Sequence, residues 1–388
     1  MGAGITLAFA NAGLAVTMVA RNSESLERGR ARVLQTYERA VSAGRLSVDE
    51  AQKRTGLIRF MADDAALADV DLVVEAIVED MAVKEALLRS VGRIAKPGAI
   101  LATNTSFLDV DMLARCTARP GDVVGLHFFS PAQVMRLLEV VQGAQTSPDV
   151  LATALAIGKR LGKISVVTKP GEGFIGNRIY TAYRNQCEFM LEEGAFPEQV
   201  DAALEGFGFA MGPFAVGDLT GLDIAWKRRQ RQAATRDARI RVPDILDRLC
   251  EAGHCGQKTG KGWYAYEAGA RKGKPHEQAH RIIEESSARK GLKRRDFSDT
   301  EIVTRAITVM VNEAALLLAD GIAQRASDID VVMVHGYGFP ASRGGPLFWT
   351  SRRPRAEITA ALDLLEQTTG FGFQRGAVDA VLDGYGQE

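Results

Sequence analysis

A histidine and a glutamate lie in two neighbouring apolar segments, and this pair is the part of the sequence best suited to chemistry. His127 lies in the segment 125–131, and Glu139 lies inside the apolar run 137–141. Both segments have the length of a buried strand, so pairing of the two strands would bring the imidazole beside the carboxylate. An imidazole oriented by a carboxylate can act as a general base. A buried core histidine and an unrelated acid would give the same local pattern.

The composition indicates a globular protein of two or three domains. The chain has 388 residues, of which 46% are hydrophobic, and its formal net charge is zero, which gives no reason to expect nucleic acid as a partner. We find no signal peptide and expect no membrane span. The last five residues carry no peroxisomal address, so we predict a cytoplasmic protein. The cysteines lack metal or disulfide spacing, and no metal site is predicted: Cys116, Cys187, Cys250 and Cys255.

Short apolar strands alternate with helices through the first 168 residues. We expect strands at 15–20, 58–61, 72–76, 100–103, 123–126, 137–141 and 165–167. Helices are expected at 23–44, 81–94 and 148–161, with Ser23 as the N-cap of the first. This alternation predicts an α/β fold with a parallel, doubly wound sheet that has helices on both faces.

The amino-terminal end resembles a dinucleotide-binding motif that begins part of the way through. Such a motif needs a strand, a glycine-rich turn and a helix whose N-terminus faces the pyrophosphate. Here the helical segment comes first, and Gly2 fits the third glycine of G-x-G-x-x-G, where a helix packs closely on a strand. We therefore predict a Rossmann-type domain lacking its first strand, with Met1 as an internal residue of a longer parent.

Beyond residue 168 the chain is almost entirely helical and contains a weak internal repeat. The segment 169–173 is rich in glycine and proline and predicts a hinge. Two helical segments, 179–213 and 302–346, each end at a Gly-aromatic-Gly-Phe turn followed by Gly-Pro. We predict the Rossmann-type domain at 1–168, a first helical domain at 169–268, a connector at 269–299 and a second helical repeat at 300–388.

Several motifs in this order resemble the 3-hydroxyacyl-CoA dehydrogenase family. They are Met1–Ile5, Val74–Glu79, Thr103–Ser106, Leu126–Pro131, Gly173–Arg178, Met211–Phe214 and Gly256–Gly262. The second helical repeat, with Gly336–Pro340 and Arg343–Trp349, is similar to the C-terminal end of the bifunctional β-oxidation enzymes. In those proteins an enoyl-CoA hydratase domain precedes the dehydrogenase on one chain.

The resemblance implies an activity and four catalytic residues. The activity is NAD-dependent oxidation of (3S)-3-hydroxyacyl-CoA to 3-oxoacyl-CoA, as in fatty-acid β-oxidation. His127 matches the catalytic base and Glu139 its orienting partner, while Ser106 and Asn177 match residues around the substrate oxygen. A base of near-neutral pKa suits the removal of a hydroxyl proton, and neutral donors suit a carbonyl oxygen. Without the resemblance, Ser106 and Asn177 would be interpreted as helix caps.

The resemblance also places Glu79, Lys84 and Asn104 near the nicotinamide half of the cofactor, with Gly2 in the pyrophosphate motif. One position departs from the family pattern. An acid usually ends the second strand and binds the ribose 2′-hydroxyl, but this chain has Ala20 followed by Arg21. A small residue followed by arginine suits a 2′-phosphate, so NADP stays open beside NAD.

The sequence leaves two other functions open. Because the first strand and the glycine turn are missing, the chain could be an inactive fragment or an acyl-CoA-binding module. It could also be a hydroxyacid dehydrogenase of related fold that acts on a substrate without coenzyme A. As partners we expect an acyl-CoA substrate and, by resemblance, an enoyl-CoA hydratase domain or a thiolase.

Two weaker motifs favour structural roles. His276 and His280 form an H-E-x-x-H string in the charged connector, which we interpret as a solvated helix start rather than a zinc site. The basic run 227–231 could meet coenzyme A phosphates, but a solvated helix end is the simpler interpretation.

Overall fold

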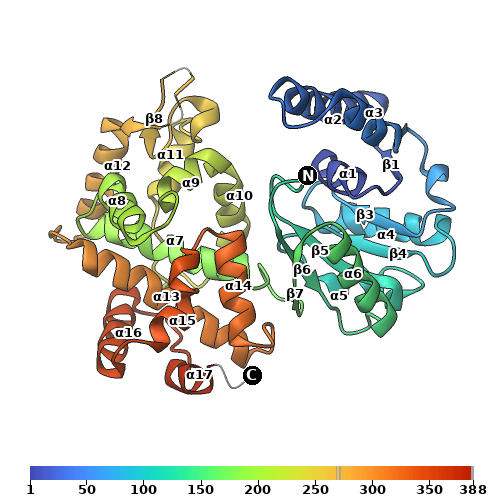
Figure 1. Ribbon diagram of the computed structural model, residues 1–388. Coiled ribbons are helices and arrows are strands. Elements are labelled where there is room, and N and C mark those ends of the chain that lie inside the picture. The colour runs from blue at the N-terminus through green and yellow to red at the C-terminus, as the bar shows by residue number, and fades with distance from the viewer. Residues whose placement is uncertain (268, 271, 386–388) are drawn as a thin grey trace. The chain divides into compact units, whose positions relative to one another are not determined.

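The computed structural model describes residues 1–267, 269–270 and 272–385, and the chain divides into two compact units (Figure 1). Unit 1 comprises Met1–Asn177 and Gly321–Gln324, and unit 2 comprises Arg178–Asp320 and Arg325–Glu388. The predicted domain limits at residues 268 and 388 lie outside the described residues. The other predicted domain limits stay predictions.

Unit 1 is an α/β domain in which strands and helices alternate as predicted. Its elements are α1 (Gly2–Asn11), β1 (Val16–Val19), α2 (Ser23–Ser42), α3 (Val48–Gly56), β2 (Ile58–Met61), η1 (Asp64–Leu67), β3 (Leu72–Glu75), α4 (Met81–Ile94), β4 (Ile100–Thr103), α5 (Val110–Arg115), η2 (Pro120–Asp122), β5 (Val123–Phe128), β6 (Leu137–Val141), α6 (Pro148–Arg160) and β7 (Ile164–Thr168). The sequence did not predict α3. The cap of α2 is also different, because the Asn22 side chain, and not Ser23, accepts the amide of Ser25.

The sheet of unit 1 is parallel except at one strand pair. Strands β3, β4, β5, β6 and β7 form one sheet in that order, and β1 pairs in parallel with β2. The pair β5–β6 is antiparallel, which corrects the prediction of a wholly parallel sheet. The physical reason is the short connection between residues 128 and 137, because a parallel return needs a crossover of a dozen or more residues.

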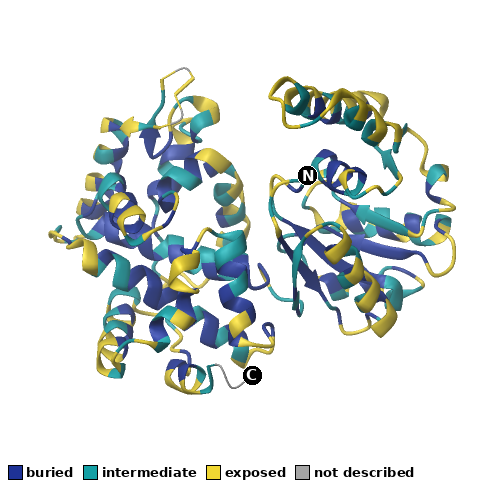
Figure 2. Cartoon of the chain, in the orientation of Figure 1, coloured by how far each residue is buried: buried dark blue, intermediate teal, exposed yellow. Residues whose placement is uncertain are grey.

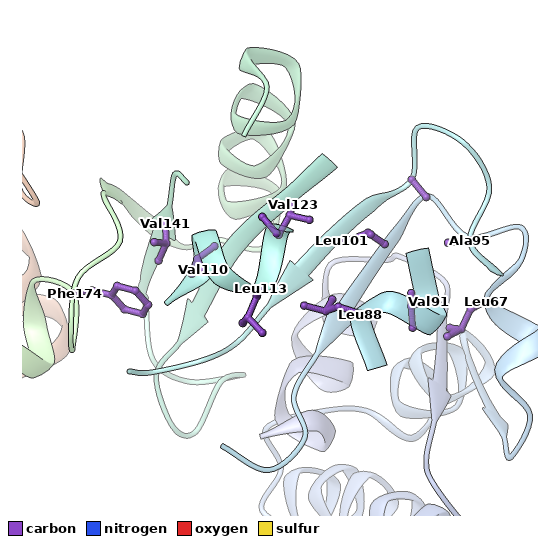
Figure 3. Close-up of a cluster of buried hydrophobic side chains, with 12 residues drawn as sticks. Leu67, Leu88, Val91, Ala95, Leu101, Val110, Leu113, Val123, Val141 and Phe174 are labelled. Atoms are coloured by element: carbon purple, nitrogen blue, oxygen red, sulfur yellow. The ribbon is translucent and has the colours of Figure 1, made fainter. Parts of the chain in front are cut away.

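Two hydrophobic layers cover the five-stranded sheet of unit 1, which the burial colours show as largely buried (Figure 2). One layer joins α4 and α5 to the sheet and includes Leu88, Leu113 and Phe174 (Figure 3). The other joins α1 and α6 to the opposite face. Helices therefore lie on both faces, and the prediction of a doubly wound domain is confirmed.

Helix α1 joins the two sheets of unit 1, which share no strand pairing. Ile5 packs in the cluster over the five-stranded sheet, whereas Ala3 and Leu7 pack with residues of α2 and β2. The residues of β1 are all half-buried, in contrast to the fully buried β4 and β5. Side-chain packing, rather than a continuous ladder, holds β1–β2 in this domain.

The described part of unit 2 is helical apart from one short two-stranded sheet. Its elements are α7 (Gly176–Glu193, which begins in unit 1), α8 (Pro197–Phe207), α9 (Pro213–Thr220), α10 (Leu222–Ala233), α11 (Ile245–Glu251), η3 (Gln257–Thr259), β8 (Tyr264–Ala265), β9 (Lys274–Pro275), α12 (Glu277–Arg289), α13 (Asp299–Ala319), α14 (Ala326–Gly336), η4 (Ala341–Arg343), α15 (Pro346–Ser351), α16 (Arg355–Thr369) and α17 (Val378–Gly384). Helices α9 and α10 follow each other directly in the chain. Gly221, with φ of 95°, separates the two.

The predicted repeat is present in unit 2, where α7–α9 correspond to α13–α15. Asp201 of α8 accepts the amides of Phe214 and Ala215 at the start of α9. Asp330 of α14 accepts the amides of Leu347 and Phe348 at the start of α15. The equivalent aromatic turns also meet, with the rings of Phe209 and Phe339 5.4 Å apart. The fold is therefore an α/β domain followed by two helical repeats, as predicted.

We expected no segment long and apolar enough to span a membrane, but helix α13 meets both criteria. Asp299–Ala319 has a mean hydropathy of 1.6 over its most apolar window, so it passes by length and composition. However, 67% of that window is buried inside the protein. Core helices of globular domains have this combination of apolar composition and burial.

Candidate functional site

His127 and Glu139 lie directly opposite each other on the antiparallel strands β5 and β6. The imidazole Nδ1 is 2.7 Å from the Glu139 carboxylate, and both side chains are buried, with 4% and 0% of the residue exposed. Directly opposed residues on one face of an antiparallel pair bring their side chains together. The carboxylate accepts the proton on Nδ1, so the lone pair of the neutral ring lies on Nε2.

The second oxygen of Glu139 is held by backbone amides at the start of α7. Ile175 and Gly176 donate to Glu139 Oε1 over 3.2 and 3.0 Å. The turn that presents these amides contains Phe174 at φ of 49°, an uncommon backbone conformation for a large side chain. The Phe174 ring is fully buried in the cluster with Val141, which fixes the turn (Figure 3). The carboxylate is therefore satisfied on both oxygens and cannot rotate freely.

Ser106 lies on the opposite side of the imidazole, in the loop that follows β4. Its hydroxyl is 3.2 Å from His127 Nε2. Helix α5 begins at Val110 with Asp109 as its cap, so Ser106 does not cap a helix. The structure thus brings three of the predicted residues together in the order carboxylate, imidazole and hydroxyl.

The loop that carries Ser106 is held by Glu79. One oxygen of Glu79 accepts the Thr105 hydroxyl at 2.6 Å and the amides of Ser106 and Phe107 at 2.8 and 3.0 Å. Burial raises the pKa of Glu79, but these hydrogen bonds and the nearby Lys84 ammonium outweigh it and lower the pKa below its ordinary value. Glu79 is therefore a carboxylate that organises the loop around Ser106.

Lys84 lies behind this loop and is almost completely buried, with 1% of the residue exposed. Its ammonium is 2.6 Å from Glu75 and 3.4 Å from Glu79. Glu75 also accepts the Thr103 hydroxyl at 2.7 Å. A buried lysine persists as a cation only with such partners. The position of Lys84 makes it a support for Glu79 rather than a group open to a ligand.

The two predicted asparagines lie at the ends of neighbouring elements. Asn104 follows β4, and its side-chain oxygen accepts the amide of Phe128 at 2.8 Å. Asn177 is the second residue of α7, directly after Gly176, so it is not the helix cap. Glu79, Asn104, Ser106 and His127 thus lie near the carboxyl ends of β3, β4 and β5. Open α/β sheets bind their ligands at this edge.

The residues predicted for the far half of the cofactor lie at α1 and β1. Gly2 begins α1, and no described atom lies within 4 Å of the position that a Cβ would take there. The close approach expected at Gly2 is found at Gly4, whose Cβ position is 2.9 Å from Gln133 and 3.3 Å from Ala132. Ala20 and Arg21 directly follow β1, and Arg21 is exposed.

Sequence reasoning missed several groups that hold the site. The amides of Ile175 and Gly176 carry no side-chain signal, although the motif 173–178 pointed to this turn. Glu75 was included in a motif without a role, and Thr105 was passed over beside Ser106. The polar side chains that end β3 and β4 were the available signal, because parallel strands end at one edge.

The interpretation of the two weaker motifs as a solvated helix start and a solvated helix end is wrong, because His276 and Arg229 are buried. His276 Nδ1 is 2.8 Å from the carbonyl of Gly262, and His280 Nε2 is 2.9 Å from Glu198. No group of three or more metal-ligating side chains lies together in the described residues. In the basic run, Arg229 is buried against Glu188, with Nη2 at 2.6 Å from the carboxylate, so it is not a solvated helix end.

Comparison with family models identifies both parts of the chain. Residues 1–170 match the model described as the 3-hydroxyacyl-CoA dehydrogenase NAD-binding domain. Residues 173–266 match the model described as the C-terminal domain of the same family. Among curated proteins, the peroxisomal bifunctional enzyme of Danio rerio is 43% identical over 364 residues, which cover 90% of this chain and 50% of that protein. The chain therefore spans about half the length of the curated relatives it matches.

Solved structures with the same architecture include one bacterial and one animal dehydrogenase. The 3-hydroxybutyryl-CoA dehydrogenase of Escherichia coli K12 is 25% identical, with a TM-score of 0.83 over 100% of this chain and 97% of that chain. The dehydrogenase part of multifunctional enzyme 1 from C. elegans is 26% identical, with a TM-score of 0.70 over 98% of this chain and 87% of that chain. Both similarities extend over the α/β unit and the helical repeats.

Proposed function

Because the chain belongs to the 3-hydroxyacyl-CoA dehydrogenase family, an oxidoreductase family whose first domain binds NAD, we propose that it oxidises (3S)-3-hydroxyacyl-CoA to 3-oxoacyl-CoA. The observation that carries this proposal is the position of His127. Its ring lies between the Glu139 carboxylate at 2.7 Å and the Ser106 hydroxyl at 3.2 Å. A base in this arrangement suits the removal of a proton from an alcohol.

In this proposal His127 Nε2 accepts the hydroxyl proton of the substrate while the carbon–hydrogen bond at the same carbon breaks. The electron pair of the O–H bond becomes the second bond of the carbonyl group. NAD, when bound, would supply the acceptor for the hydride that leaves the carbon. Glu139 keeps the proton on Nδ1 and stabilises the imidazolium that forms. In the reverse direction the imidazolium returns its proton to the oxygen.

Ser106 and Asn177 are proposed to orient the substrate oxygen. The Ser106 hydroxyl already contacts Nε2, so an alcohol oxygen that approaches Nε2 also comes within reach of this hydroxyl. Asn177 directly follows Gly176, and the amide of Gly176 donates to Glu139. The backbone on the N-terminal side of Asn177 is therefore held by the same carboxylate that orients His127. Neutral donors of this kind stabilise the partial charge on an oxygen that is becoming a carbonyl.

The polar groups at the ends of β3 and β4 fit the nicotinamide half of NAD. Glu79 and Asn104 lie at this edge, and Glu79 is about one quarter exposed at its side chain (28%). We propose that both contact the cofactor, and that Lys84 contributes by fixing Glu79. Loss of the Lys84 ammonium would leave Glu75 buried without its cation.

The relatives support a cellular location different from the cytoplasm. The relatives from Danio rerio and Arabidopsis thaliana are named as peroxisomal proteins. We propose a peroxisomal location in place of the cytoplasmic one predicted from the sequence. The substrate is a 3-hydroxyacyl thioester, which hydration of an enoyl thioester produces. We therefore propose an enoyl-CoA hydratase domain as the source of the substrate and a thiolase as the consumer of the product.

Replacement of the base gives the direct test. His127→Gln should reduce kcat for a (3S)-3-hydroxyacyl-CoA by about three orders of magnitude or more, because general-base assistance is lost. The rate is followed as NADH formation, and thioester binding, measured by calorimetry, should stay nearly unchanged. His280→Gln is the matched control, because His280 also pairs with a glutamate, Glu198, at 2.9 Å in unit 2. A His127→Gln enzyme that retains more than a tenth of the activity would refute the assignment.

A second function is favoured by one observation, the division of the sheet in unit 1. The pair β1–β2 and the five-stranded sheet share no ladder hydrogen bonds, and a dinucleotide site spans this part of a Rossmann-type domain. A chain that binds acyl-CoA without turnover would bind the thioester but no NADH. Titration with NADH, followed by nicotinamide fluorescence, distinguishes this module from the enzyme.

A further inference from the structure

The segment that follows β1 occupies the place where a dinucleotide-binding domain holds the adenine ribose. Strand β1 follows α1 directly and pairs in parallel with β2, with Val19 opposite Met61. In such a domain the end of the strand after the first helix faces the ribose hydroxyls. The residues at this end are Ala20, Arg21 and Asn22.

Ala20 takes the position at which an acid would select NAD. A carboxylate there accepts hydrogen bonds from the 2′- and 3′-hydroxyls and repels a 2′-phosphate. The methyl group of Ala20 can do neither. The next side chain is also not an acid, because it is the guanidinium of Arg21. The element that would discriminate against a 2′-phosphate is therefore missing at the end of β1.

Arg21 is exposed and makes no hydrogen bond or ion pair with the described residues. Two of the acids near this end of the strand pair have other partners. Glu24 pairs with Arg28, and Asp63, beyond the end of β2, accepts the amide of Ala65 at 2.9 Å. A guanidinium is the side chain best suited to bind a phosphate with two parallel hydrogen bonds.

The backbone beside Arg21 also suits an anion. Asn22 accepts the amide of Ser25 and so begins the 20-residue helix α2 at this point. The first amides of a helix have no partner within the helix, and the helix dipole gives its N-terminus a partial positive charge. A phosphate beside Arg21 would thus meet a cationic side chain and the N-terminus of α2, whose first turn also carries Glu24, paired with Arg28.

We propose that the ribose end of this cofactor site accepts a 2′-phosphate, so that the chain binds NADP(H) as well as NAD(H). Arg21 is the residue that contacts the phosphate, and Ala20 is the residue that permits it. The inference rests on the proposed function, because it assumes that a dinucleotide binds along the carboxyl edge of the sheet. It concerns the adenosine half alone and leaves the roles of His127 and Glu139 unchanged.

The test compares the binding of NADPH and NADH to the wild-type chain by nicotinamide fluorescence, without turnover. We expect the Kd values to agree within about tenfold, because no carboxylate opposes the phosphate. Arg21→Ala should raise the Kd for NADPH about 10-fold or more and change that for NADH less than about threefold. Ala20→Asp should weaken the binding of NADPH and strengthen the binding of NADH, so that the variant prefers NADH.

The matched control is Arg45→Ala, which removes an exposed arginine just beyond the other end of α2. Its NADPH affinity should equal that of the wild type, and an effect as large as that of Arg21→Ala would overturn the assignment to Arg21. Tight NADH binding with an NADPH affinity weaker by more than tenfold overturns the inference and leaves the proposed function intact. Binding of neither cofactor overturns the proposed function together with the inference.

Discussion

Units 1 and 2 each contain buried carboxylates that accept two successive backbone amides at the start of a helix. In unit 1 Glu139 accepts the amides of Ile175 and Gly176, where α7 begins. In unit 2 Asp201 and Asp330 do the same for α9 and α15. Each carboxylate satisfies amides that have no partner inside their own helix, at the end where the dipole favours a negative charge.

The difference lies in the third partner of each carboxylate. Asp201 and Asp330 accept tyrosine hydroxyls, from Tyr264 at 2.8 Å and from Tyr385 at 2.5 Å. Burial and the neighbouring Asp201 raise the pKa of Tyr264, so this hydroxyl stays protonated and donates to Asp201. Glu139 instead holds an imidazole whose other nitrogen faces Ser106.

The comparison indicates that a buried carboxylate at a helix start has a structural role in all three places. In the repeats it ties a helix to its neighbour and accepts a tyrosine hydroxyl. In unit 1 the corresponding carboxylate instead holds the imidazole of His127. The chemistry therefore depends on the partner of the carboxylate, and substitutions of the carboxylates and of their partners should separate the two roles.

Among the changes to these carboxylates, the largest effect is expected for Glu139→Gln. The amide can accept from the backbone or from the imidazole, but it cannot stabilise an imidazolium as a carboxylate does. We expect kcat to fall about 10²- to 10⁴-fold, with a loss of stability of about 1–3 kcal/mol from the buried, poorly matched amide group. Stopped-flow reduction of NAD and urea denaturation measure the two effects. A kcat within threefold of the wild type would remove the distinction between Glu139 and the aspartates.

Asp201→Asn should affect stability alone. The asparagine presents one acceptor oxygen where two amides and a hydroxyl now donate, so at least one buried donor loses its partner. We expect a loss of about 2 kcal/mol in the free energy of unfolding and an unchanged kcat per folded molecule. Urea denaturation and active-site titration measure the two quantities. A fall in kcat comparable to that of Glu139→Gln would show that the unit 2 carboxylate is not merely structural.

Much of this arrangement could be predicted from the sequence, because it depends on local pattern. The apolar runs of β5 and β6 placed His127 and Glu139 on strands, and the short connection between the runs is compatible only with the antiparallel pairing that sets them opposite each other. The repeat was visible because both copies keep an aspartate, an aromatic turn and a Gly-Pro pair at similar spacing.

The rest could not be predicted, because it depends on which elements meet in three dimensions. The resemblance placed Lys84 at the cofactor, but its burial between Glu75 and Glu79 depends on the packing of α4 against β3. The amides that hold Glu139 have no side-chain signal at all. The spacing at Gly2 suggested close packing, yet the contact falls at Gly4, because the loop with Ala132 and Gln133 packs there.

The raised pKa of Asp201 predicts that the stability of the protein depends on pH. Burial raises the pKa of Asp201 to about 7, although the amides of Phe214 and Ala215 and the hydroxyl of Tyr264 oppose this rise. A carboxyl with a raised folded pKa contributes stability that is complete below its unfolded pKa near 4 and is lost as the pH rises through about 7.

We therefore expect the wild type to lose about 1–3 kcal/mol of unfolding free energy between pH 5.5 and pH 8, from this group. Asp201→Asn cannot ionise, so its loss over the same range should be smaller. Asp218 and Asp247, whose pKa values burial raises to about 6, contribute equally to both proteins and cancel in the comparison. Urea denaturation at the two pH values measures the effect. Parallel pH profiles of the two proteins would contradict the burial of Asp201 as a carboxyl of raised pKa.

The smallest effects are expected for substitutions of the two tyrosines. These substitutions test whether the third partner of each carboxylate separates the structural aspartates from Glu139. Tyr264→Phe removes one hydrogen bond to Asp201 and leaves the two amides in place, so it should cost about 1 kcal/mol of stability. Tyr385→Phe should cost less, because its side chain is only half-buried. A double-mutant cycle of Tyr264→Phe with Asp201→Asn should show coupling, whereas neither tyrosine variant should change kcat. If Tyr264→Phe lowered kcat tenfold, its hydroxyl would have a catalytic role, and the identity of the third partner would no longer separate a structural carboxylate from a catalytic one.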